Sequence, residues 1–402
     1  MAPNEVSVTH PDGVKHLLLQ ALPKGSFYGI GAIPDWRFQT PISARDPKEK
    51  MERSKAFASG YALSNVVKYE EALSRVVSKL FGWMDRFSGS GKPMDLDQFF
   101  TFTTFDVVGE VLFSKEFGFI EKGEDIGNSI SNNAALQGIG TPVSQFRWLQ
   151  LVLGNPLVTI LGLSPGSMLF RHALETLLER QKNPDARFDV VAHWFKYLNQ
   201  HPDRTSFRNI EAQTTMNVGA GSDTVSCGLQ STIYHMIRHP ETWKAARAEI
   251  LEAQAKGLCL EKVVSYADAQ QLGYLQACIK EGLRVHSPVP MGLPRVAPKG
   301  GIEVGGRYFP EGTTLSINPW VFHRNKAIWG ADANEFRPER WLSPDAARLE
   351  KFFIPVGPSS GIPCVALALS NLCNSSVRSW LYVLSRTAHC SYGITQDLLH
   401  RK

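Results

Sequence analysis

The stretch 217–224 reads Asn-Val-Gly-Ala-Gly-Ser-Asp-Thr, so that an acidic residue and a hydroxyl residue are adjacent after several small residues. Three small residues followed by an acid and a hydroxyl, here Asp223 and Thr224, are a poor choice for an ordinary buried helix. Gly219 and Gly221 each cost about 1 kcal/mol relative to Ala inside a helix, and a threonine hydroxyl can bond backbone carbonyls. The stretch therefore predicts a locally opened helix with room beside it for a flat ligand and a small molecule. The alternative is a core helix whose glycines only permit close packing.

A second candidate site is the pair Glu281 and Arg284, which form the only Glu-x-x-Arg in the chain. Residues three apart share one face of a helix. The pattern alone indicates a surface ion pair, which contributes at most about 1 kcal/mol to the stability of the protein.

Apolar periodicity places both motifs on helices. A run without proline extends from about Arg208 to Arg238 and stops at His239-Pro240, and its apolar residues recur at helical spacing: Ile210, Val218, Val225, Leu229, Ile233 and Met236. A second amphipathic helix ends near His286 and carries Leu272, Leu275, Cys278, Ile279 and Leu283. The first motif should thus lie in the middle of a long helix, and the second should lie on a shorter one.

The remaining pattern is helical first, with short strands after it. Residues 61–120 read as successive helices, and Asp46-Pro47 begins another. Strands are expected near residues 5–8, 300–306 and 313–317. The aromatic loop 27–41 either lines a pocket or is a surface loop held by its aromatic side chains. Residues 143–170 form either a mobile lid or two short core helices.

Composition excludes several classes of protein. With 402 residues, 43% of them apolar, the chain can bury a large core. A net charge of +5 is too mild and too scattered to indicate a nucleic-acid partner. The six cysteines are sparse and contain no Cys-x-x-Cys pair, which argues against a disulfide scaffold or a zinc ribbon. No apolar run approaches the roughly 20 residues of a membrane-spanning helix, and no signal-peptide pattern is present.

The order of the motifs resembles that of a cytochrome P450. The segments that carry this resemblance are Ala220-Gly221-Ser222-Asp223-Thr224, Glu281-Gly282-Leu283-Arg284, Pro338-Glu339-Arg340-Trp341, and a Phe-x-Pro-x-Gly loop followed by a cysteine. The N-terminal part is similar to the fungal group that includes pisatin demethylase. The resemblance implies a mainly α fold with a small β-sheet, the cytochrome P450 fold, as a single domain over residues 1–402. It also implies that the amino-terminal anchor of the family is absent, so the chain is expected to be shortened at that end.

The resemblance also assigns roles around a haem b group, iron protoporphyrin IX. The helix at Ala220 and Gly221 would pass over the distal face of the haem, Thr224 would bond the bound dioxygen, and Asp223 would relay protons. Glu281, Arg284 and Arg340 would form a buried structural triad. Arg295, and less directly Arg53, would bind haem propionates. Substrate contacts would come from residues 27–41, 216–220 and 289–293.

The proximal ligand implied by the resemblance is a cysteine thiolate, which favours O–O cleavage. The family loop reads Phe-x-x-Gly-x-Arg-x-Cys-x-Gly. Counted from Gly357, taken as the residue after the Phe position, its cysteine falls at 363, where this chain has Pro363 followed by Cys364; Gly361 stands at the Arg position. Cys364 is the predicted axial ligand of the haem iron, and Cys373 reads as a helix residue. From residue 358 onward the chain departs from the family pattern.

The resemblance therefore predicts a haem-thiolate monooxygenase that oxidises an apolar small molecule, with terpenoid or polyketide secondary metabolism in fungi as the expected context. Its partners would be O2, the substrate, and an NADPH–cytochrome P450 reductase. Family members lie on the cytosolic face of the endoplasmic reticulum, so a cytoplasmic or peripheral location is expected. The irregular loop leaves one alternative, a catalytically impaired P450-like pseudoenzyme or a faulty gene model that binds haem poorly.

Overall fold

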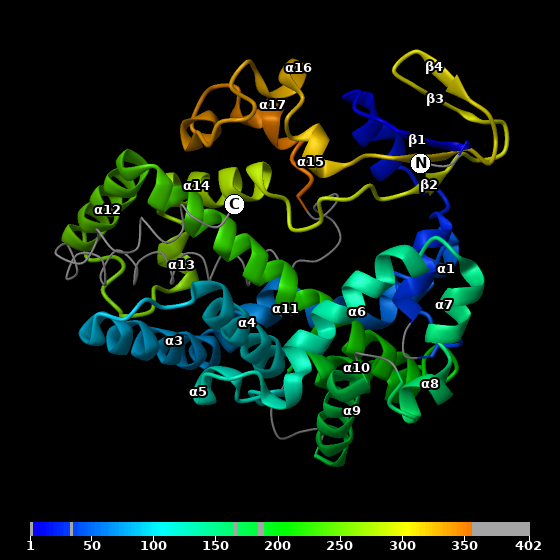
Figure 1. Cartoon of the computed structure of the whole chain (residues 1–402), viewed down its shortest axis with the longest axis horizontal. Coiled ribbons are helices and arrows are strands. Elements are labelled where there is room, and N and C mark those ends of the chain that lie inside the picture. Colours follow the sequence, from blue (N-terminus) through cyan, green and yellow to red (C-terminus); the bar gives the residue numbers. More distant parts are fainter. Residues whose placement is uncertain (1–2, 33–34, 164–166, 184–188, 356–402) are drawn as a thin grey trace.

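Helices make up most of the protein, and two small sheets lie at one end of it (Figure 1). The structure is a computed structural model that describes residues 3–32, 35–163, 167–183 and 189–355. Cys364, Cys373 and the rest of the predicted haem-ligand loop lie outside the described residues. The prediction of a mainly α fold with a small β-sheet is confirmed.

In the described residues of the first half, strand β1 and the helices α1 to α10 precede the long central helix. Their bounds are β1 (Glu5–Ser7), α1 (Pro47–Phe57), α2 (Leu63–Val66), α3 (Glu70–Ser90), α4 (Leu96–Phe113), α5 (Phe119–Lys122), α6 (Ser129–Val143), α7 (Arg147–Leu153), α8 (Pro156–Ile160), α9 (Ser167–Lys182) and α10 (Val190–Gln200). One π-helical turn (Val14–Leu18) and a 3-10 segment (Ser26–Ala32) separate β1 from α1. Helix α1 begins as expected, because the Asp46 carboxylate accepts hydrogen bonds from the backbone of Lys48 and Glu49.

The second half contains the central helix and then the strands. Its elements are α11 (Phe207–Arg238), α12 (Pro240–Ala255), α13 (Tyr266–Ala269), α14 (Gly273–Val285), β2 (Arg295–Val296), β3 (Ile302–Val304), β4 (Arg307–Phe309), β5 (Thr314–Ser316), α15 (Pro319–Phe322), α16 (Lys326–Trp329) and α17 (Ala346–Glu350). Strand order in the larger sheet is β1-β5-β2, with β1 parallel to β5, so the N-terminus joins a strand more than 300 residues away. The predicted strands are confirmed.

Helix α11 runs through the middle of the molecule (Figure 1). It begins at a capping box, in which the Ser206 and Asn209 side chains each bond the backbone of the other residue. It ends before His239, and Pro240 then occupies the first turn of α12, where its missing N–H costs nothing. The predicted bounds of this helix are confirmed.

The predicted local opening at Gly219 and Gly221 is wrong, because α11 is helical without interruption from residue 207 to residue 238. The Thr224 hydroxyl does bond the Ala220 carbonyl at 3.0 Å and approaches the Gly221 carbonyl at 3.4 Å. Packing of α11 against α4, α14, α9 and α10 offsets the intrinsic cost of the glycines. Tertiary burial therefore keeps the helix regular where local propensity favours a break.

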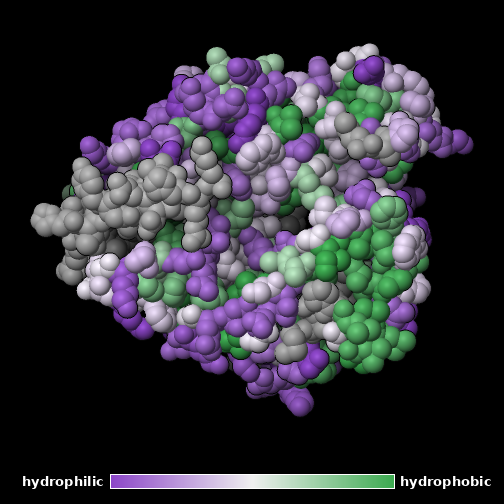
Figure 2. Space-filling model, viewed as in Figure 1, coloured by the Kyte–Doolittle hydropathy of each residue, from purple (hydrophilic) through white to green (hydrophobic). Residues whose placement is uncertain are grey.

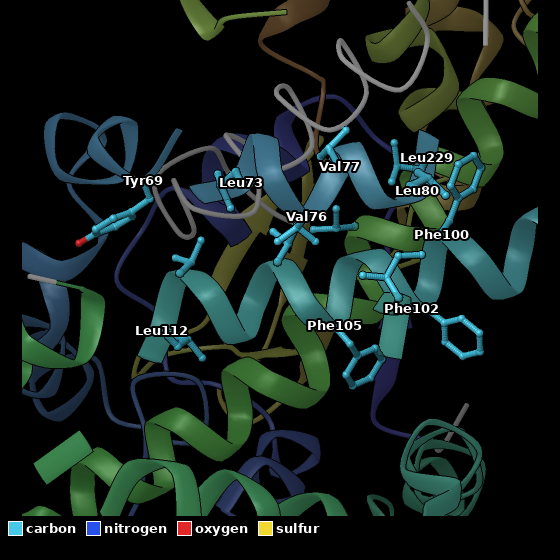
Figure 3. Packing of buried hydrophobic residues seen from close by; sticks show 14 of the residues in the cluster. Tyr69, Leu73, Val76, Val77, Leu80, Phe100, Phe102, Phe105, Leu112 and Leu229 are labelled. Atoms are coloured by element: carbon cyan, nitrogen blue, oxygen red, sulfur yellow. The ribbon is translucent and has the colours of Figure 1, made fainter. Parts of the chain in front are cut away.

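The main hydrophobic core lies where α4 is enclosed by α3 and α11. Figure 3 shows side chains of α3 lying along α4, with Leu229 of α11 close to Leu80 and Phe100. Phe100, Phe102 and Phe105 are at most 1% exposed. Burial of each such side chain contributes about 1.5–3 kcal/mol, so this core fixes α11 from one side.

Helix α14 fixes α11 from another side through a close backbone approach. A Cβ atom at Gly282 would lie 2.6 Å from the Thr232 Oγ1 and 2.9 Å from the Thr232 Cα. The Ser231 hydroxyl donates to the Gly282 carbonyl at 2.9 Å. Because no larger residue fits at position 282, α14 and α11 cross at a fixed point, and the Glu281 side chain lies next to that crossing.

Helices α7 and α8 carry exposed apolar side chains. The two short helices expected in this region are present, but they are not core helices: Trp148 is 65% exposed and Ile160 is 73% exposed. Figure 2 shows a broad apolar area where Figure 1 places these helices. Among the described residues, no helix combines the length and the apolar character needed to cross a membrane.

Candidate functional site

The middle of α11 has one face that the surrounding helices leave open. Ala220 is exposed, and Gly221 and Thr224 are partly exposed, whereas Ser222 and Val225 are buried. Ala220 and Thr224 are four residues apart and therefore share this face. Small side chains in this position leave space for a ligand beside the helix, although the helix itself stays closed.

Asp223 lies next to this face and is mostly shielded from solvent. Asn133 of α6 donates to its Oδ2 at 2.6 Å, and Gln137 of α6 donates to the same oxygen. Burial raises the pKa of Asp223 to about 6, against the opposing effect of these two hydrogen bonds. A carboxyl group that titrates near neutral pH can both accept and donate a proton, which is the property that a relay requires.

The structure brings Glu281, Arg284 and Arg340 into contact. Glu281 lies 2.8 Å from the Arg284 Nη2 and 2.8 Å from the Arg340 Nε. The Trp341 indole N–H and the Arg337 backbone N–H also donate to the Glu281 carboxylate, each at 2.9 Å. Since both ends of the Glu281–Arg284 pair are 0% exposed, the surface reading of this pair is wrong.

The two guanidiniums also hold the following segment by its backbone carbonyls. Arg284 donates to the carbonyls of His323, Ala333 and Glu335, and Arg340 donates to those of Trp329 and Asp332. Buried polar groups need such partners. The triad thus ties α14 to the segment that leads to residue 355.

A group of cations lies beside the aromatic loop. The Arg295 Nη1 donates to the Tyr28 hydroxyl at 2.8 Å, and the Lys24 Nζ lies 4.9 Å from the centre of the Tyr28 ring. Burial, followed by the nearby charges of Arg295 and Lys50, lowers the pKa of Lys24 to about 7. Within the described part of the chain, none of these three cations forms an ion pair, and the Nε and Nη2 of Arg295 donate to no protein atom.

Arg53 lies on α1 with its donors already engaged. Its guanidinium bonds the Glu49 carboxylate at 2.7 Å and the Gln39 carbonyl at 3.0 Å. Lys50, on the same helix, acts on Lys24 through its charge. Sequence reasoning missed Lys24, Asn133 and Gln137, which have no local signal. Lys50 belongs to a run of basic residues on α1, and that run indicates either a solvated face or a surface for an acidic ligand.

These residues fit a haem group on chemical grounds. A cation cluster without acidic partners in the described residues matches the propionate carboxylates of haem b. The open, small-residue face of α11 matches the flat porphyrin. Cys364, the predicted axial ligand, lies outside the described residues.

Comparison with known proteins decides the family. A family model described as Cytochrome P450 matches residues 3–357. The chain belongs to the cytochrome P450 family. By family this P450 is a monooxygenase that uses haem and electrons from a redox partner.

Several fungal proteins are similar to this P450. It is 29% identical to a cytochrome P450 monooxygenase of Aspergillus flavus, over 86% of this chain and 71% of that protein. It is 31% identical to a cytochrome P450 monooxygenase of Aspergillus terreus, over 87% of this chain and 74% of that protein. It is 32% identical to pisatin demethylase of Fusarium vanettenii, over 80% of this chain and 62% of that protein. The predicted resemblance, including its narrower fungal part, is confirmed.

Proposed function

We propose that this P450 is a haem-thiolate monooxygenase acting on an apolar secondary metabolite of the terpenoid or polyketide type. It inserts one oxygen atom of O2 into the substrate and releases the other as water, with electrons from NADPH through a separate NADPH–cytochrome P450 reductase. The observation that carries this proposal is the pair Asp223 and Thr224 at the open face of α11, where the acid titrates near neutral pH.

Each residue of the site has a distinct role in the proposal. The haem, when bound, would supply O2 activation, and Cys364 would hold its iron. Arg295, with Lys24 nearby, neutralises the propionates. Thr224 presents its hydroxyl to the ligand space, and Asp223 supplies it with protons.

The substrate space is proposed to lie between the aromatic loop and α11. The Met216 methyl group lies 3.1 Å from the position that a Cβ of Gly31 would take, so the loop 27–41 and the start of the 216–220 segment are in contact. With residues 289–293, these segments form the proposed lining.

The haem-ligand assignment is tested by the ferrous–CO spectrum. We expect the thiolate-type red-shifted Soret band in the parent protein, its loss in Cys364→Ser, and its retention in the matched control Cys373→Ser. Protein that stays colourless with hemin, or that shows no thiolate band, supports the pseudoenzyme alternative and overturns the enzyme proposal.

The role of the hydroxyl is tested by the coupling of oxygen use to product. Thr224→Ala should consume NADPH and O2 but release peroxide in place of product, whereas Thr224→Ser keeps the hydroxyl and should stay coupled. An unchanged product yield in Thr224→Ala removes Thr224 from the mechanism.

Two further assignments belong to the proposal. One domain is proposed for residues 1–402. In the described part, Phe353 packs against both the main core and a second buried cluster, which includes Leu17, Leu315 and Phe322. A single cooperative unfolding transition is expected, and two separate transitions contradict it. The chain is placed peripherally at the endoplasmic reticulum, because apolar surface exposed on α7 and α8 favours lipid contact. Flotation with neutral lipid vesicles tests this, and protein that stays at the bottom of the gradient contradicts it.

A further inference from the structure

Two amide side chains of α6 converge on a single oxygen of Asp223. Both Asn133 and Gln137 donate to Oδ2, and they are four residues apart on one face of α6. In the part of the chain that the structure describes, the other oxygen, Oδ1, accepts no hydrogen bond from the protein. One carboxylate oxygen is thus fixed and the other is left for water or a neighbouring hydroxyl.

A glycine on α11 makes room for this contact. Asn133 is 4% exposed and lies across α11 at Gly219, where an added Cβ would be 3.1 Å from the Asn133 Oδ1. Asn133 also approaches the Gly219 carbonyl at 3.5 Å. Gln137, by contrast, is exposed on the outer side of the same contact. Close packing of Asn133 therefore explains why a glycine occupies position 219, although glycine is unfavourable inside a helix.

The partners of Asp223 carry no charge. Within the described residues no cation pairs with it, and α6 supplies only neutral amides. The titratable group that acts on it through charge is Asp97 of α4, which raises its pKa. The Cys227 thiol of α11 is uncharged where Asp223 titrates, because burial first, and then Asp97 and Asp223, raise the pKa of the thiol. A basic residue on α6 would instead hold the acid in its ionised form.

We propose that Asn133 and Gln137 are positioning residues that orient Asp223 for proton delivery, fixing Oδ2 against α6 and leaving Oδ1 directed to the relay. Neutral donors suit this task, because they set the orientation of the carboxyl without locking it in one protonation state. The inference rests on the proposed function, since it gives α6 a part in the same reaction.

The first test measures the protonation of Asp223 without turnover. Infrared spectra of the ferric holoenzyme are recorded across pH, and the carboxylic C=O band of Asp223 is assigned by its loss in Asp223→Asn. Gln137→Leu removes one hydrogen bond to the ionised form, so the midpoint should rise by about one pH unit. Gln137→Lys places a cation beside the carboxylate and should lower the midpoint by about one unit.

The matched controls change the next position on α6. Asn132 forms no hydrogen bond to Asp223, so Asn132→Leu and Asn132→Lys should leave the midpoint where it is in the parent protein. Asn133→Leu should raise the midpoint as Gln137→Leu does. Gln137 is the primary site because it is exposed and its substitution leaves the core intact.

The second test asks whether the same contact matters for turnover. Product formed per NADPH consumed is measured across pH, and the acid limb of this profile should move with the infrared midpoint, up in Gln137→Leu and down in Gln137→Lys. A residue with only a structural role would lower the yield at every pH without moving the limb.

The outcomes separate the two proposals. Equal infrared midpoints in all variants overturn the positioning role, even if the enzyme is active. If the infrared midpoints move but the acid limb of product formed per NADPH stays fixed, the amides bind Asp223 without affecting proton delivery. That result also overturns the positioning role. A parent holoenzyme that forms no product refutes the proposed function, and the infrared series still decides whether α6 orients the carboxyl.

Discussion

Removing the charge of Glu281 should destabilise the protein by about 3 kcal/mol. The carboxylate is 0% exposed and is the acid that the buried Arg284 and Arg340 share. Breaking a buried ion pair by removing one partner costs about 3–5 kcal/mol, because a charge is left without compensation. In Glu281→Gln, Arg284 keeps its bonds to the carbonyls of His323, Ala333 and Glu335, which favours the lower end of that range.

Urea unfolding followed by far-ultraviolet circular dichroism measures this loss in the holoenzyme. Glu350→Gln is the matched control, since Glu350 forms an exposed pair with Lys280 and its removal should cost under about 1 kcal/mol. In Glu281→Gln, Arg340 keeps, among the described residues, only its longer ion pair with Asp332, at 3.4 Å. Adding Arg340→Met removes this weakly compensated cation, so the double variant should be more stable than the sum of the single losses predicts. A loss below about 1 kcal/mol in Glu281→Gln, or strict additivity, would refute the reasoning.

The other predictions concern α11 and its neighbours. The pKa of Asp223 is raised from 3.8 to about 6 in the folded state, so its ionisation increasingly opposes folding as the pH rises from about 4 to about 6. Asp223→Asn should therefore stabilise the protein by up to about 3 kcal/mol at pH 7–8 and should have no effect below pH 4. Urea unfolding at each pH measures this difference. Gly282→Ala should cost about 1–3 kcal/mol by the same assay, since its Cβ would meet Thr232, and a neutral result would contradict the close crossing. Phe105→Ala, at a 0% exposed position, should cost about 3–5 kcal/mol, and a loss under 1 kcal/mol would show that this core can collapse around the gap.

The long helix could be bounded from sequence because its signals are local. Apolar residues at spacings of three and four, the absence of proline from about Arg208 to Arg238, and His239-Pro240 at the end all lie within the helix or at its boundary. The opening at Gly219 was wrong for the opposite reason. Its cost is local, but the packing that offsets it comes from helices far away in the chain, and from Asn133 in particular.

The site was accessible to sequence reasoning only in part. Glu281 and Arg284 could be placed on one helix face, but their burial depends on Arg340, which is 56 residues beyond Arg284 and was linked to them by family resemblance alone. Lys24 and Gln137 gave no signal, because an isolated lysine or glutamine has no pattern and acquires meaning only from its neighbours in space. Residues that act together on one helix could be predicted from the sequence pattern. Contacts between residues on helices or loops far apart in the sequence could not.

The contact between Gly282 and Thr232 has a consequence for how the ligand space can change its width. The two helices are in close backbone contact, with no side chains between them that could repack. Helix α11 therefore cannot move toward α14 unless α14 and the triad of Glu281, Arg284 and Arg340 move as well. Helix α6 meets the opposite side of α11 at Asn133 through exchangeable polar bonds and packs chiefly against α9. Widening for a bulkier ligand should therefore be asymmetric, with α6 displaced from α11 at Asn133 while α11 stays in place against α14 and α9.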